Sequence, residues 1–307
     1  NSYAAITYVQ SRIEMKEAKT KDILLLLLLG AIWGSSFFNI KIATYAFEPF
    51  TLALVRVIFA ILTLLAVSFY YKIKILAFSK KKWKIYALVG LCNIAIPFSL
   101  IAIGTKEVDS YLAAILMSTT PLTGSILAHI FTKNEKITFL KSLGIVLGFM
   151  GVMLLFFDKL IINESNYLFA IIILVGSTFY SISGIMILKY LKKSGNINVT
   201  TSTLIWSVIF LIPMSFIFED PLNSTPTLYS ILSLIYLGVV ATGFAWWLRF
   251  KILAKNGLVF QTQVAYLIPI FGVIFGSLVL SEQITWKVLT SLIIIISGIY
   301  IVKKYNK

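Results

Sequence analysis

Long apolar blocks, separated by short polar segments, make up almost the whole chain after residue 22. A membrane-spanning helix needs about 20 consecutive, predominantly apolar residues. Blocks of that length without any Asp, Glu, Lys or Arg are Ile85–Thr105, Ser110–Thr132, Ser165–Leu188, Ser194–Phe218, Pro221–Leu248 and Asn256–Ser281. Helices of water-soluble proteins keep a polar face, whereas these blocks are apolar on every face. The pattern therefore predicts an all-α integral membrane protein.

Clusters of charged and turn-forming residues divide the chain into ten predicted transmembrane helices. These lie near residues 22–44, 50–71, 83–105, 110–131, 138–157, 167–190, 199–218, 228–252, 259–280 and 287–303. Residues 1–21 remain as a polar N-terminal tail, which we expect to be cytoplasmic.

Lysine and arginine set the expected orientation. Most of the basic residues fall in every second connection, as in the cluster of Arg249, Lys251 and Lys255. The intervening connections hold only Lys41, Lys106, Lys159 and Lys287. Basic residues accumulate in cytoplasmic loops. We therefore expect both termini in the cytoplasm and a multi-pass protein of the cytoplasmic (inner) membrane.

Composition narrows the possible functions. The net charge of +15 is spread over short loops between apolar blocks, which indicates contact with the lipid bilayer and no nucleic-acid partner. With one cysteine, Cys92, and one histidine, His129, neither an intrachain disulfide nor a metal site is expected. A phosphate-binding glycine loop with its lysine is missing, so we expect no direct use of ATP and no cofactor.

The two halves of the chain resemble each other. Glu135 matches Glu282 at an offset of 147 residues. At an offset of 148, Pro121 matches Pro269, Gly90 matches Gly238 and Gly124 matches Gly272. Five spans are an odd number, so the second half must enter the membrane upside down. Such inverted repeats are a recurring transporter design, and we expect the two repeats at residues 22–157 and 167–303.

Short motifs give this duplication a more specific meaning. They are Gly30–Phe37, Glu48–Phe50 with Arg56 and Ala60, Pro121 with Glu135 and Thr138, and Pro269 with Glu282 and Thr285. In this order and spacing they resemble the EamA family of the drug/metabolite transporter superfamily. The segment Phe179-Tyr180-Ser181 departs from the tryptophan-containing motif expected at the start of the second half. The resemblance implies ten spans and transport of amino acids, other small metabolites or drugs, often outward.

Arg56 is the one charged residue well inside a predicted span. It lies about six residues, or roughly 9 Å, from the outer end of its helix. A charge in the membrane is costly and needs partners or water. Two readings stay open: the guanidinium holds a substrate carboxylate, or it is a structural tie to backbone carbonyls of neighbouring helices.

Pro121 and Pro269 occupy matched positions near the middles of the fourth and ninth spans. Proline removes a helix hydrogen bond and frees a carbonyl, so matched prolines indicate a hinge and a midplane site where the repeats meet. We interpret Glu135 and Glu282 as helix-capping or gating groups, because each lies at a helix start, where negative charge is favoured.

Polar and aromatic residues accompany these positions in several predicted spans. Besides Arg56, the candidate substrate-binding residues are Trp33, Ser36, Asn93, Ser118, Thr119, Tyr180, Trp247, Gln261, Gln263 and Tyr266. Polar groups in a membrane must face one another or a wet cavity, and this set suits an amphiphilic organic solute. Serine and threonine also bond their own helix backbone, and tryptophan also packs against lipid.

The predicted function is secondary transport of small organic metabolites by alternating access, with amino acids as the leading substrate class and export as the direction. No Asp or Glu lies away from the edges of a predicted span, which argues against a proton-coupled cation pump. One alternative is uptake or exchange of a nucleotide-like metabolite. Another is a polytopic membrane enzyme using Glu107 and Asp109. The spacing of Gly144 and Gly148 allows close helix packing within a monomer or between the protomers of a homodimer.

Overall fold

The computed structural model describes residues 20–131, 137–156 and 164–305, and every regular element in these ranges is a helix. The first half contains α2 (Thr20–Ala43), α3 (Pro49–Tyr70), α4 (Trp83–Gly90), η1 (Leu91–Ala95), α5 (Ile96–Glu107), α6 (Ser110–Met117), α7 (Thr120–Phe131) and α8 (Phe139–Phe156). The second half contains α10 (Glu164–Met186), η2 (Ile187–Leu191), α11 (Asn196–Phe218), α12 (Leu228–Ile235), η3 (Tyr236–Phe244), α13 (Ala245–Gln261), α14 (Val264–Leu280) and α15 (Trp286–Lys304). The elements labelled η are π-helical.

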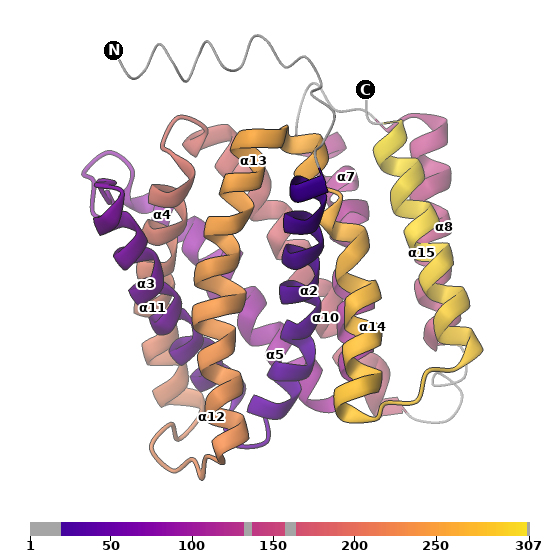
Figure 1. The fold of residues 1–307 in the computed structure, drawn as a ribbon, viewed down its shortest axis with the longest axis horizontal. Coiled ribbons are helices and arrows are strands. Elements are labelled where there is room, and N and C mark those ends of the chain that lie inside the picture. Colours follow the sequence, from indigo (N-terminus) through magenta and orange to yellow (C-terminus); the bar gives the residue numbers. More distant parts are fainter. Residues whose placement is uncertain (1–19, 132–136, 157–163, 306–307) are drawn as a thin grey trace.

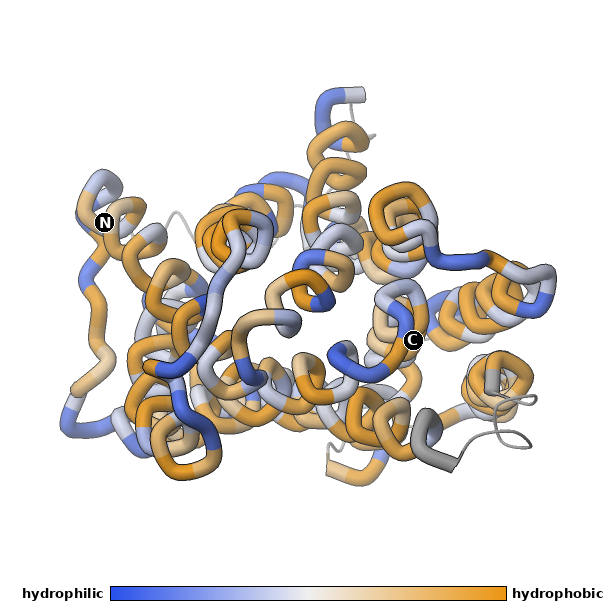
Figure 2. The backbone as a smooth tube through the Cα atoms, turned by 90° about the horizontal axis from the view of Figure 1, so that it is seen from below, coloured by the Kyte–Doolittle hydropathy of each residue, from blue (hydrophilic) through white to orange (hydrophobic). Residues whose placement is uncertain are grey.

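Within the described ranges, eight helices, some of them composed of consecutive elements, are long and apolar enough to cross a membrane. Two shorter apolar helices, Phe139–Leu155 and Val264–Leu280, accompany them. Figure 2 shows the same division, with apolar residues along the helices and hydrophilic segments mainly in the connections. The prediction of an all-helical membrane protein is therefore confirmed.

The start of α2 and the end of α15 lie at the same end of the bundle (Figure 1), which we call the terminal end. The connection from α11 to α12 and the one from α14 to α15 lie at the opposite end. The helices thus run back and forth between two ends, as helices of a multi-pass protein do. Most of the predicted polar tail, residues 1–21, lies outside the described residues.

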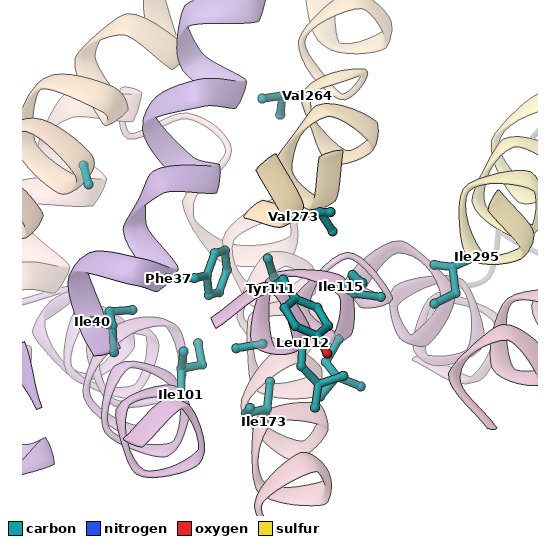
Figure 3. Packing of buried hydrophobic residues seen from close by; sticks show 14 of the residues in the cluster. Phe37, Ile40, Ile101, Tyr111, Leu112, Ile115, Ile173, Val264, Val273 and Ile295 are labelled. Carbon is teal, nitrogen blue, oxygen red and sulfur yellow. The ribbon is translucent and has the colours of Figure 1, made fainter. Parts of the chain in front are cut away.

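Helix α6 is at the centre of the fold. Its residues from Ser110 to Leu116 are all buried, and it packs against α2, α10 and α14. In Figure 3, Phe37 and Ile40 of α2 lie near Ile101 of α5, with Tyr111 and the following residues of α6 beside them. A helix that is apolar all round is stable when it is enclosed by other helices, and α6 is enclosed in this way.

Contacts between helices repeat across the two halves. Helix α2 packs against α14, and its counterpart α10 packs against α7. Likewise, α3 packs against η3, and its counterpart α11 packs against α4 and η1. Helix α10 also packs against α5, and its counterpart α2 packs against α12 and α13. Other contacts join counterparts directly: α8 with α15, α3 with α11, and α6 with α14. This is the pattern that a two-fold relation between two repeats produces.

The matched glycines make equivalent contacts. A Cβ on Gly90 would lie 2.6 Å from the carbonyl oxygen of Thr203 on α11, and one on Gly238 would lie 2.7 Å from the carbonyl oxygen of Arg56 on α3. Each glycine directly precedes or lies within the π-helical turns of its half. The third helix of each half therefore touches the second helix of the other half backbone to backbone.

Helices α8 and α15 also cross through glycine. A Cβ on Gly298 would lie 2.6 Å from both the carbonyl oxygen of Gly144 and the nitrogen of Gly148. Small residues allow such close approach between membrane helices. The Gly144/Gly148 spacing is thus used within one protomer, between the last helices of the two halves.

We expect Gly298→Ala to destabilise the protein, because its methyl group must push α8 and α15 apart. Overpacking of this kind costs about 1–3 kcal/mol, which should lower the Tm of the detergent-solubilised protein by a few degrees in a thermal unfolding measurement. Gly184→Ala is the matched control, since no atom lies within 4 Å of the added Cβ, and its Tm should stay equal or rise. Equal Tm values for the two variants would contradict this packing.

Candidate functional site

Arg56 joins the two halves through a side-chain hydrogen bond. Its side chain is buried, and Nε donates to Oγ1 of Thr242 in η3 at 2.9 Å. The guanidinium carbon lies 4.0 Å from the centre of the Phe98 ring of α5. Thr242 Oγ1 donates in turn to the carbonyl oxygen of Leu237 at 2.8 Å, five residues earlier in the π-helix. An arginine of the first half is therefore held by the π-helical turns of the second half.

The guanidinium uses little of its hydrogen-bonding capacity. Arginine carries five N–H donors, and among the described residues the only recorded acceptor for Arg56 is the Thr242 hydroxyl. Buried polar groups normally have partners. No described backbone carbonyl accepts from this side chain.

A second bond between the halves involves the other π-helix. Ser183 of α10 donates from Oγ to Oδ1 of Asn93 in η1 at 2.7 Å, and both side chains are buried. Tyr180, one turn earlier on α10, and Trp247 of α13 both pack against a buried apolar cluster that includes Val57 and Phe98 of the first half and Leu204 of the second half. Since Phe98 of this cluster contacts the Arg56 guanidinium, Tyr180 and Trp247 lie where the halves join.

Helix α2 approaches η3 from another side. Trp33 donates from Nε1 to the carbonyl oxygen of Ala241 at 3.1 Å. Its ring meets that of Trp246 edge to face, with centroids 6.4 Å apart. Ser35 Oγ and Tyr236 Oη share a 2.6 Å hydrogen bond. The residue that accepts from Trp33, Ala241, is adjacent in the chain to Thr242, the hydrogen-bond partner of Arg56.

Three candidate hydroxyls are bonded within their own helical segments. Ser36 donates to the carbonyl oxygen of Ile32, Ser118 to that of Ile115, and Thr119 to that of Leu116. All three side chains are buried. Their hydroxyl groups are thus bonded locally. Among the described residues, no recorded hydrogen bond joins them to Arg56 or Thr242.

Gln261 and Gln263 differ from their predicted placement. Helix α13 continues to Gln261, with a kink at Gly257 (φ 81°), and α14 begins only at Val264. Gln261 therefore belongs to the end of the preceding helix, where its buried Oε1 has no hydrogen-bond partner in the structure. Glycine adopts positive φ without strain, which allows this kink before the ninth predicted span.

Gln263 and Tyr266 line a separate depression of about 490 Å³. Its other wall consists of α15 residues, namely Ile296, Ser297, Tyr300 and Ile301. Neither Arg56 nor Thr242 lines this depression. The depression lies towards the terminal end, where α14 begins and α15 ends (Figure 1).

The matched prolines have different local effects. Pro121 lies in the first turn of α7, where the span is broken after α6. The hydroxyl of Thr120 donates to the carbonyl oxygen of Met117 at 2.6 Å, the acceptor that a proline at position 121 leaves without its helical donor. Ser181 donates to the carbonyl oxygen of Thr120 at 3.1 Å. Pro269, in contrast, lies inside the continuous helix α14.

Glu282 caps a helix of the other half instead of its own. Its carboxylate accepts from the backbone nitrogens of Ser110 (2.6 Å) and Tyr111 (3.1 Å) and from the Ser110 hydroxyl (2.9 Å). These are free N–H groups at the start of α6, where the helix dipole favours an anion. Helix α15 is capped by Thr285. The matching Glu135 lies outside the described residues.

Glu219 makes an equivalent bridge that the sequence pattern did not single out. Its carboxylate accepts from the backbone nitrogens of Phe50 and Thr51, each at 2.7 Å, and from the Thr51 hydroxyl at 2.8 Å. It thus caps α3 from the end of α11. An acidic residue at a span edge is common, and nothing in its local sequence identifies a partner 168 residues away.

Comparison with known proteins bears on the whole chain. The model of the family described as "EamA-like transporter family" matches residues 20–157 and 168–303. The "Uncharacterized transporter YoaV" of Bacillus subtilis (strain 168) is 25% identical over 270 residues, which cover 88% of this chain and 92% of the relative. An "Uncharacterized transporter" of Buchnera aphidicola subsp. Schizaphis graminum (strain Sg) is 28% identical over 261 residues, 83% of this chain and 84% of the relative.

A solved structure titled "Crystal structure of protein" has the same fold, with a TM-score of 0.68 and 13% sequence identity over 94% of this chain and 99% of that chain. The family match falls separately on the two halves whose helix contacts repeat. This multi-pass helical membrane protein therefore belongs to the EamA-like transporter family.

Proposed function

We propose that this chain is a secondary transporter that moves small organic solutes with a carboxylate group by alternating access. Amino acids are the leading substrate class, and export from the cytoplasm is the proposed direction. The observation that carries the proposal is Arg56, a buried guanidinium where the two halves meet, whose only recorded acceptor among the described residues is the Thr242 hydroxyl.

The surroundings of Arg56 suit an amphiphilic anion. A guanidinium binds a carboxylate through two parallel hydrogen bonds, which are stronger in an interior of low dielectric constant than in water. The rings of Phe98, Tyr180 and Trp247 supply apolar surface nearby. A carboxylate would therefore bind at Arg56 while the rest of the solute lies against aromatic side chains.

The proposal includes the complete membrane topology. It has ten spans, with α8 and α14 crossing the bilayer as well, and places the terminal end in the cytoplasm. The two halves, residues 22–157 and 167–303, are the units that move relative to each other. Inverted repeats suit alternating access, and π-helical turns such as those of η1 and η3 are frequent at functional sites.

Closure at the opposite end would depend on the carboxylates that cap helices of the other half. Glu282 and Glu219 hold the first turns of α6 and α3. Lys41 adds a contact within the first half, since its Nζ donates to the carbonyl oxygens of Lys106 and Val108 at 2.8 and 2.9 Å. An outward-open state would require some of these charge-assisted bonds to break. We therefore assign Glu282 to gating.

Counterflow in proteoliposomes tests the role of Arg56. With a panel of labelled amino acids, wild type should exchange one class saturably. Arg56→Gln should lower kcat/KM for that class by about tenfold or more, the loss expected for charged hydrogen bonds, and Arg56→Lys should restore part of it. Lys72→Gln, which removes an exposed cation, is the matched control and should behave as wild type.

Unchanged exchange by folded Arg56→Gln protein would overturn the proposed site. Exchange of nucleotide-type metabolites, with none of the amino acids, would replace the substrate class by the alternative uptake or exchange carrier. Size-exclusion profile and Tm establish that each variant is folded.

We expect Glu282→Gln to weaken the closed end. Loss of the charge in hydrogen bonds to three donors should cost about 1–3 kcal/mol and lower the Tm in a thermal unfolding measurement. Glu107→Gln is the matched control, because Glu107 is exposed at the same end of the bundle, and its Tm should not change. A Tm for Glu282→Gln equal to that of wild type would argue against the cap as a stabilising contact.

A further inference from the structure

A second arginine lies inside a membrane helix. The sequence pattern counts Arg249 with Lys251 and Lys255 as a basic cluster at the expected cytoplasmic end of the predicted span 228–252. In the structure the candidate span continues from Leu228 to Gly257. Arg249 thus precedes the kink at Gly257 by eight residues, or roughly 12 Å along the helix. Arg249 is only partly exposed.

Arg249 has no protein acceptor in the part of the chain that the structure describes. Its one recorded interaction is with an aromatic ring: the guanidinium carbon lies 4.8 Å from the centre of the Trp246 ring. Of the neighbouring cations, Lys255 pairs with Asp22 at 2.5 Å. Lys251 is exposed and lies 5.1 Å from the centre of the Trp247 ring. Arg249 follows Leu228 by 21 residues of this span, or roughly 32 Å along the helix, so it lies near the terminal-end boundary of a hydrocarbon core about 30 Å thick. A partly exposed guanidinium there attracts anions.

The position of Trp246 shows where Arg249 lies. Trp246 meets the ring of Trp33, and Trp33 is bonded to Ala241 of η3. Helix α13 packs against α2 along this side. The second ring beside Trp246 is that of Phe250, with centroids 5.8 Å apart. Arg249 therefore adjoins an aromatic group between α2 and α13, where the first and second halves meet.

Arg249 and the hydrogen-bond partner of Arg56 lie on the same membrane span. Thr242, the partner of Arg56, precedes Arg249 by seven residues of the same span, a separation of roughly 10 Å along the axis. This span runs from the α11–α12 connection to the terminal end (Figure 1), so Arg249, which follows Thr242 in the chain, is nearer the terminal end. Two guanidinium groups thus follow one another at successive depths, each beside aromatic rings.

We propose that Arg249, with Trp246 and Trp33, forms a second binding site for the carboxylate of an apolar or aromatic organic solute. The site lies on the terminal-end side of Arg56, and a solute entering from that end is held there before it reaches Arg56. The order of the two sites rests on the proposed transport function, whereas anion binding at Arg249 does not.

Fluorescence quenching tests anion binding without a known substrate. Iodide is the anionic probe and acrylamide the neutral one, and the part of the emission lost in Trp246→Phe reports on this site. Arg249→Gln should lower iodide quenching of that part by about twofold or more, because the positive field that concentrates the anion is removed, and should leave acrylamide quenching unchanged. Arg249→Lys keeps the charge and should retain iodide quenching.

Lys251→Gln is the matched control, since it removes a cation two residues away at an exposed position, and it should leave the Trp246-dependent quenching as in wild type. Two results would overturn the anion site. One is equal iodide quenching in Arg249→Gln and wild type. The other is an equal change with acrylamide, which would indicate general loosening of the structure.

Transport measured from each face tests the order of the sites. In oriented proteoliposomes, Arg249→Gln should raise the KM for the exchanged amino acid about tenfold at the terminal-end face, with the KM at the other face unchanged. Equal KM values in the variant and wild type at both faces would refute the entry role. If wild type moves no carboxylate-bearing solute while the iodide result holds, the proposed function fails and the anion site remains.

Discussion

The hydrogen bond from Arg56 to Thr242 is the interaction on which the centre of this structure depends. A charged side chain in the membrane interior is expensive, so the protein must provide compensating groups around it. It does so with the π-helical turns of the opposite half and the face of the Phe98 ring. Gly238 allows this contact, because its missing side chain lets η3 reach the backbone of α3 at Arg56 itself.

The two halves are joined both by close glycine contacts and by polar side-chain bonds. Glycine contacts hold backbone against backbone between α8 and α15 and, at the centre, at Gly90 and Gly238. The central contacts are accompanied by the hydrogen bonds of Arg56 to Thr242 and of Ser183 to Asn93, each made to a π-helical segment. The proposed alternating access would use the central bonds and the caps of Glu282 and Glu219.

Much of the fold could be predicted from the sequence, because lipid requires long apolar helices and these are visible as charge-free blocks. Arg56, Asn93, Tyr180 and Trp247 stand out for the same reason, as polar or large aromatic residues in such blocks. Local hydroxyl bonding is different: Ser36, Ser118 and Thr119 look identical in sequence whether they face a solute or their own helix. The kink at Gly257 places Gln261 at the end of the preceding helix instead of in the predicted ninth span. The partner of Glu282 depends on tertiary packing, which a local pattern does not contain.

Accessibility of a thiol placed beside Arg56 tests directly whether this site binds the solute and opens to each side of the membrane. In Thr242→Cys protein with Cys92→Ser, so that position 242 holds the only cysteine, the adjacent guanidinium favours the reactive thiolate. Membrane-impermeant thiosulfonate reagents would be applied to each face of sealed vesicles, with and without saturating solute. The account predicts modification from both faces and protection by the solute. Modification from one face only, with a rate that the solute leaves unchanged, would contradict it.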